Sequence, residues 1–149
     1  MTPKQYFEEV AEPTVAEFLL EPTSVRLTLL ACMTCYHVID ALAVDRGRRK
    51  ASKLYDELVL EQPSLRIIKA VALLAKHVEP NQAGFQVRSD HLKKSSGAAF
   101  SDGTYYSDGT SHAGSRDVVV LQSPGFSKTD LSHALSKSMS FLKAQIALG

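Results

Sequence analysis

Apolar residues recur along the first half of the chain at the spacing of buried helix faces. Residues 3–20 form one such run, and Pro13 is expected to kink or restart its helix. Residues 24–44 are apolar on nearly every side, which is typical of a central, buried helix. Shorter helices are expected from about Arg49 to Glu61 and from Pro63 or Ser64 to about Val78. This half of the chain is therefore expected to fold as a helical bundle.

The pattern changes after Pro80, where glycine and serine become frequent. A loop-rich insertion with short β elements is expected over residues 80–127. Within it, residues 117–122 give the clearest strand pattern, because they include four consecutive aliphatic residues. Residues 85–87 and 105–106 are further strand candidates.

A final amphipathic helix is expected after Ser127, whose position three residues before Asp130 resembles a capping box. Its apolar face extends to Ile146. Its polar face is expected to meet water and carries Ser132, Ser136, Lys137, Ser140 and Lys143. The chain is therefore expected to form one domain, residues 1–149, of the mainly α class. Its predicted architecture is a helical bundle with a small β-hairpin or sheet before the C-terminal helix.

Composition adds no strong electrostatic preference to this picture. The 149 residues carry a net charge of +1, and 44% are hydrophobic, which is typical of an ordinary globular domain. So small a charge provides no general attraction to nucleic acid or to an anionic membrane. Charged and polar residues interrupt the longest apolar run, and residues 1–9 lack the pattern of a secretory signal. We therefore expect a cytoplasmic protein without a membrane span.

Residues 24–38 and 64–78 repeat each other at an offset of forty residues. Each copy has an arginine and, eleven residues later, a histidine, which are Arg26 and His37, then Arg66 and His77. Eleven residues are close to three helical turns, so both side chains share one helix face. If the two helices run parallel as neighbours, a polar cluster of His37, Asp40 and His77 forms at one end of the bundle.

Three explanations of this repeated stripe are open. In the first it is structural: the arginines pair with carboxylates, and the histidines bond to buried backbone groups or to Asp40. In the second, His37, Asp40 and His77 bind zinc or iron, although only three ligands can be named. In the third, the stripe belongs to a nucleotide or RNA site. We expect no metal and no cofactor.

A dense basic cluster follows the long helix. It could contact the phosphates of RNA or DNA. Alternatively, it is a solvated loop in which Arg46 complements the C-terminal end of the long helix. The cluster consists of Arg46, Arg48, Arg49, Lys50 and Lys53.

The Arg and His stripe, the run Ala75-Lys76-His77-Val78 and the four-helix arrangement resemble the HEPN superfamily of small helical-bundle proteins over about residues 22–80. Many members of that superfamily are RNases of toxin or defence systems that act as homodimers with a shared cleft. Their motif is an arginine, four to six residues and a histidine, whereas ten residues separate each pair here. The resemblance implies an RNA-cleaving enzyme whose catalytic candidates are Arg26, His37, Arg66 and His77.

From the residues alone we expect a non-catalytic binding or assembly protein, which forms a homodimer through one apolar face of the bundle. A protein partner or RNA is its expected ligand. The HEPN-like RNase or toxin-type enzyme is the alternative function.

Overall fold

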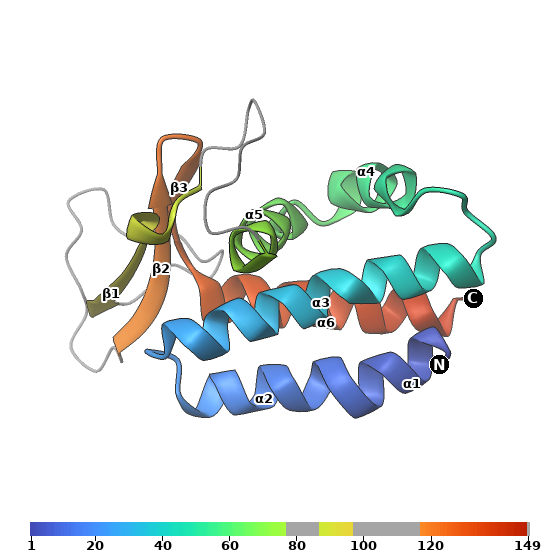
Figure 1. Ribbon diagram of the computed structural model, residues 1–149, viewed down its shortest axis with the longest axis horizontal. Helices are drawn as coiled ribbons and strands as arrows, with labels where there is room; N and C mark the ends of the chain where they lie inside the picture. Colours follow the sequence, from blue (N-terminus) through green and yellow to red (C-terminus); the bar gives the residue numbers. More distant parts are fainter. Residues whose placement is uncertain (77–86, 97–116, 149) are drawn as a thin grey trace.

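The computed structural model describes residues 1–76, 87–96 and 117–148 of the chain. A small sheet lies at one end of the helical bundle, and the two chain ends lie at the other (Figure 1). The predicted fold class is confirmed: the chain is mainly α, with a small antiparallel sheet before the C-terminal helix. The elements are α1 (Pro3–Tyr6), the π-helical η1 (Phe7–Ala11), α2 (Glu12–Leu20), α3 (Val25–Asp45), α4 (Ala51–Glu61), α5 (Ser64–Lys76), the 3-10 turn η2 (Ser89–His91), β1 (Leu92–Ser96), β2 (Asp117–Ser123), β3 (Phe126–Asp130) and α6 (Leu131–Ala147).

The first helical run changes its hydrogen-bond pattern in the middle. Thr2 caps α1: its Oγ1 accepts from the Gln5 N–H at 3.1 Å, and the Gln5 side chain accepts from the Thr2 N–H at 2.9 Å. Pro13 lies in the first turn of α2, directly after η1. Tyr6, Ala11 and Glu12 all keep right-handed helical backbone angles, so the helical run continues through Pro13 and the restart expected there is not found.

The central helix of the bundle is α3, which contacts α1, α2, α4, α5 and α6. Ser24 caps it, because the Ser24 Oγ accepts from the Leu27 N–H at 3.3 Å. Its buried side chains form one broad face of the helix, whereas Arg26, His37 and Val44 are exposed on the opposite side, so the expected burial on nearly every side is found only in part. These buried residues are Leu27, Thr28, Ala31, Cys32, Thr34, Cys35, Val38, Ile39, Leu42 and Ala43.

Within the described ranges, α3 is also the one helix long and apolar enough to cross a membrane, with a mean hydropathy of 1.7. Core helices of globular domains pass the same test of length and composition. Other helices pack around α3 in the middle of the molecule (Figure 1). Of its apolar stretch, 56% is buried inside the protein, so burial accounts for part of its hydropathy.

The neighbouring helix α5 packs extensively on α3 but does not run beside it in the same direction. In Figure 1, α3 lies across the view, whereas α5 is seen nearly along its axis. The parallel arrangement expected from the forty-residue repeat is therefore wrong. Because the two helices cross, the described positions of the two copies are not level with each other along their whole length.

Tyr55 fixes α4 against α3 and α5. Its ring contacts Tyr36 edge-on, with ring centroids 6.0 Å apart, and the Lys69 ammonium lies 3.9 Å from the Tyr55 centroid. Burial raises the pKa of the Tyr55 phenol to about 12; Tyr36 and Asp56 add to the rise, and Arg66 opposes it. The phenol therefore stays neutral at physiological pH, and its contact with the ammonium is a cation–π interaction.

The sheet is antiparallel, with strand order β1-β2-β3. Because strand side chains alternate, β2 places Val119 and Leu121 in the main core and Val118 and Val120 in a second buried cluster. The Pro22 C=O accepts from the Val119 N–H at 2.9 Å. This bond ties the turn between α2 and α3 to the sheet.

The strand predicted over residues 117–122 is confirmed, but the start of the last helix is corrected. Ser127 lies in β3, and the N-cap of α6 is Asp130, whose Oδ1 accepts from the Ser132 N–H at 2.7 Å. The capping box at Ser127 was wrong, because the chain stays extended up to Asp130. Val87, the described part of the candidate strand 85–87, is not in a strand, and residues 105–106 lie outside the described residues.

Leu135 and Leu60 provide a matched test of the core. Leu135 of α6 is fully buried, whereas Leu60 of α4 is 83% exposed. Leu135→Ala is expected to lower the free energy of unfolding by about 2–5 kcal/mol, because it leaves a cavity and removes apolar contacts. Leu60→Ala is expected to change it by less than about 0.5 kcal/mol. Urea unfolding followed by circular dichroism measures both values, and equal losses would contradict the packing.

Candidate functional site

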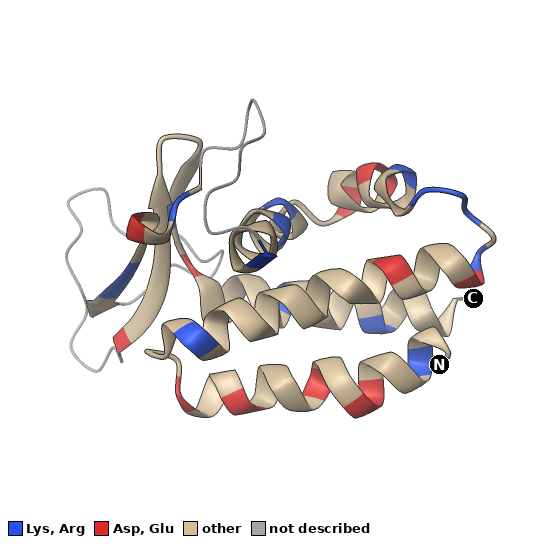
Figure 2. Cartoon of the chain, viewed as in Figure 1, with Lys and Arg blue, Asp and Glu red and all other residues tan. Residues whose placement is uncertain are grey.

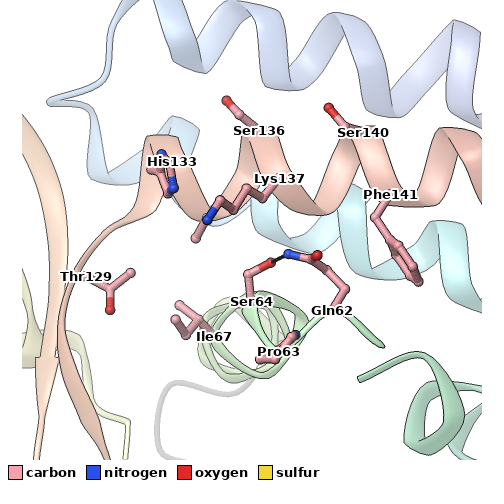
Figure 3. Close-up of a pocket in the computed structure, with 11 residues that line it drawn as sticks. Gln62, Pro63, Ser64, Ile67, Thr129, His133, Ser136, Lys137, Ser140 and Phe141 are labelled. Carbon is pink, nitrogen blue, oxygen red and sulfur yellow. Dashed lines mark hydrogen bonds between the residues drawn. The ribbon is translucent and has the colours of Figure 1, made fainter. Parts of the chain in front are cut away.

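A groove of about 890 Å³ lies between the start of α5 and the first half of α6. The end of β3 borders it on the sheet side (Figure 3). We refer to it as the α5–α6 groove. It is lined by Gln62, Pro63, Ser64, Ile67, Thr129, His133, Ala134, Ser136, Lys137, Ser140 and Phe141.

The start of α5 forms one wall and is joined to α6 by a chain of hydrogen bonds. The Gln62 Nε2 donates to the Ser64 Oγ at 2.7 Å, and the Ser64 Oγ lies 2.7 Å from the Ser138 Oγ. Because the Ser64 hydroxyl accepts from Gln62, its own proton is available to Ser138. Ser138 is fully buried, so this contact anchors the start of α5 inside the core.

Side chains four residues apart along α6 form the opposite wall. His133, Lys137 and Phe141 occupy successive turns, and Lys137 extends back along the helix toward His133 (Figure 3). Ser136 and Ser140 stand on the adjoining face of the helix. Lys137 is exposed, and its ammonium has no ion pair or hydrogen bond in the part of the chain that the structure describes. This ammonium is therefore available to a ligand.

Thr129 and His133 lie at the sheet side of the groove (Figure 3). The Thr129 Oγ1 donates to the Ser127 C=O at 2.8 Å, within β3. The Nε2 of His133 is buried and has no hydrogen-bond partner among the described residues. A buried polar atom without a partner destabilises the structure, so a ligand that reached this nitrogen would gain free energy from the contact.

The described members of the predicted Arg and His stripe do not line this groove. Arg26 and Arg66 are exposed in the first turns of α3 and α5, and the Arg66 guanidinium lies 6.0 Å from the centroid of the Phe126 ring. His37 is exposed on α3. His77 lies outside the described residues, so the predicted polar cluster is placed only in part.

Asp40, the carboxylate of that predicted cluster, lies near ionisable side chains of three helices. Burial raises the pKa of the Asp40 carboxyl above its ordinary value, and the charges of His37 and Lys76 oppose part of the rise. Burial also raises the pKa of the Tyr6 phenol, with a further contribution from Asp40. Asp40 borders a second, smaller pocket of about 460 Å³ beside the N-terminus of α1. The chain therefore gathers ionisable groups here, next to the end of α5 that precedes His77.

The basic cluster after α3 divides into bound and unbound side chains. The Arg46 guanidinium donates to the Gln145 C=O at 2.9 Å and to the Gln145 Oε1 at 3.2 Å. It therefore binds the C-terminal end of α6, while its expected contribution to the end of α3, whose C-cap residue it is, stays a prediction. Arg48 pairs with Glu57 at 3.1 Å. The other members of the cluster are exposed and have no partner within the described ranges; they are Arg49, Lys50 and Lys53. Figure 2 shows this basic segment after α3.

Metal-binding side chains do not gather in the described ranges, where no group of three or more histidines, cysteines or carboxylates could hold an ion. The metal site predicted with His77 lies partly outside these ranges. Cys32 and Cys35 are fully buried in α3, and burial raises the pKa of the Cys35 thiol to about 12. That thiol stays protonated, which is not the form that binds metals.

Comparison of the chain with known protein families, with curated proteins and with solved structures finds no match. The resemblance to the HEPN superfamily therefore stays a prediction, as do the homodimer and the cytoplasmic location.

Part of the lining of the α5–α6 groove could be predicted from the sequence. Ser136, Lys137 and Ser140 were expected on the wet face of the last helix, and they line an open groove. Ser132 was expected on the same face but is buried, at 4% exposure. His133 was not singled out, although it precedes Lys137 by one turn. The wall at the start of α5 could not be inferred, because neither segment specifies its contact with the other.

Asp40→Asn is expected to stabilise the protein at neutral pH. The raised pKa means that the folded state binds this proton more tightly than the unfolded state. The group's stabilising contribution is therefore present at low pH and is lost as the pH rises from the ordinary to the raised pKa. Asparagine has no proton to lose in this pH range. The variant is therefore expected to be more stable than the wild type above the raised pKa, and this gain disappears below the ordinary pKa.

Urea unfolding at several pH values measures the effect of Asp40→Asn. Asp56→Asn, which changes an exposed carboxyl on α4, is the matched control. A gain in stability that does not change with pH would contradict the assigned environment of Asp40.

Proposed function

We propose that this protein is a non-catalytic binding protein whose α5–α6 groove holds a small molecule with polar and apolar parts. The combination of size and lining chemistry carries this proposal. The volume of about 890 Å³ lies within the range of small-molecule sites, which is roughly 300–1,000 Å³. Such sites join apolar contact surface with a few polar groups that fix the orientation of the ligand.

The lining residues provide both kinds of contact. Ile67 lies beside Ser64, and Phe141 projects toward Gln62 from the opposite wall (Figure 3). The aliphatic and aromatic side chains supply contact area, while the hydroxyl and amide groups supply hydrogen bonds. Because the two walls belong to packed helices, the shape of the groove is set before a ligand arrives, which lowers the entropy lost on binding.

The hydrogen bonds in the groove favour binding over catalysis. Nucleophilic catalysis by serine needs a base within hydrogen-bond reach of the hydroxyl. Ser64 is bonded to Ser138 and Gln62 instead. The buried Nε2 of His133 bonds to no described residue. An activated serine–histidine pair is therefore not formed by the described lining residues.

Ile67→Trp is expected to weaken ligand binding, because the larger side chain fills the groove. The probe is a mixture of benzoate, benzamide and benzyl alcohol, added to isotope-labelled protein and followed by NMR. In the wild type, chemical shifts should change at the start of α5 and in the first half of α6. In Ile67→Trp these changes should be smaller at the same ligand concentrations.

Val59→Trp is the matched control, since it enlarges another half-buried aliphatic side chain, on α4 and outside the groove lining. Circular dichroism establishes that both variants are folded. Shifts confined to other elements, or shifts that Ile67→Trp leaves unchanged, would contradict the binding function.

RNA cleavage is the second candidate function, and the ionisable groups around Asp40 favour it. His37 is exposed one turn before Asp40, and Lys76 acts electrostatically on the same carboxyl. An imidazole can transfer protons as a general acid or base, and a nearby lysine can bind a phosphate. The resemblance to HEPN proteins supplies the class of reaction.

His37→Ala is expected to abolish cleavage of mixed RNA if this second function holds, because it removes the group that transfers the proton. His77→Ala should have the same effect, whereas His91→Ala, in η2, should leave cleavage unchanged. Gel electrophoresis of the RNA after incubation with purified protein provides the measurement. Intact RNA after incubation with the wild type would exclude RNA cleavage.

A further inference from the structure

The charge of the α5–α6 groove indicates which molecules it binds, an inference that rests on the binding function proposed above. We infer that the groove selects an amphipathic oxyanion, a small molecule that carries a phosphate or carboxylate group on an apolar body. In this arrangement Lys137 binds the oxyanion, and the apolar body packs toward Phe141.

Lys137 gives the groove its positive charge. Among the described lining residues no carboxylate is present, and Lys137 is the one lysine or arginine. The neighbouring carboxylates in sequence are Glu61, exposed at the end of α4, and Asp130, which accepts from the Ser132 N–H. Because Lys137 has no ion pair within the described ranges, an oxyanion does not have to displace a carboxylate to reach it.

Polar groups surround the place that Lys137 reaches. Figure 3 shows the end of its side chain between His133 and Ser64. Phosphate and carboxylate groups accept several hydrogen bonds at once, and charge-assisted bonds are the stronger ones. The N-terminus of α5, whose helix dipole also favours a negative charge, opens at Ser64. An oxyanion placed here would therefore meet the Lys137 cation of α6 and the positive end of the α5 helix dipole.

The other end of the groove is apolar. Phe141 and Pro63 lie beside Gln62 at this end (Figure 3). Lys137 and Phe141 are four residues apart, so their backbone positions are separated by about 6 Å along the helix axis. The Lys137 side chain extends away from Phe141, toward His133, so the cation lies more than one helical turn from this apolar surface (Figure 3). A ligand with an apolar body can span that separation, whereas a free inorganic ion cannot.

A matched series of ligands tests this inference, with phenyl phosphate, benzoate and benzyl alcohol titrated into the folded protein. NMR shifts locate the binding site and give the dissociation constant. Both anions are expected to bind in the groove more tightly than benzyl alcohol, and added salt should weaken the anions alone. The comparison of phenyl phosphate with benzoate separates the two kinds of oxyanion, and the tighter ligand identifies the preferred group.

Variants of Lys137 test whether its positive charge is responsible for the binding of anions. Lys137→Met is expected to weaken the binding of both anions about tenfold, the effect of removing one hydrogen bond to a charged group, and to leave benzyl alcohol unchanged. Lys137→Arg should retain the binding of anions because it keeps the cation. Lys53→Met makes the same change of net charge on α4, outside the groove lining, and is the control.

Two results would overturn the selection of anions while leaving the binding function intact. The first is that all three ligands bind in the groove with equal affinity. The second is that Lys53→Met weakens the anions as much as Lys137→Met. If none of the three ligands binds in the groove, both the selection of anions and the proposed binding function are contradicted.

Discussion

Burial of the broad apolar face of α3 is the constraint on which the rest of the structure depends. A long helix with a wide apolar face is stable in water only when other elements cover that face. The described chain meets this requirement with five helices that all contact α3, and with a turn before α3 that is bonded to the sheet. The contact of each helix with α3 sets its position. The contacts between the surrounding helices follow from these positions.

The α5–α6 groove follows from that arrangement. Both helices pack on α3, and α5 is seen along its axis where α6 runs across the view (Figure 1). Two crossing helices touch over a short length and leave space beside the contact. Ser64 and Ser138 mark the contact, and the groove lies next to it. The opening between α5 and α6 is therefore a property of helix packing, and the residues that line it determine what it can bind.

The sequence predicted those parts of the fold that depend on local pattern. The apolar character of α3 and the aliphatic strand β2 were both visible in the order of residues. The strands β1 and β3 were not, because Leu92–Ser96 and Phe126–Asp130 lack an aliphatic pattern and form strands by pairing with β2. The crossing of α5 over α3 and the reach of Arg46 to the end of α6 depend on contacts between distant segments, which no local pattern specifies. The same reason applies to the α5–α6 groove. The polar face of α6 could be predicted from the sequence, but the opposite wall at the start of α5 could not.

A crystal structure of the protein soaked with phenyl phosphate tests the central claim most directly, since it shows the helix crossing and its occupant together. The predicted result has α5 crossing α3, the Ser64 and Ser138 hydroxyls in contact, and the ligand between the start of α5 and the first half of α6. A structure in which α5 runs parallel to α3, or in which the ligand occupies another part of the molecule and leaves the groove empty, would contradict it.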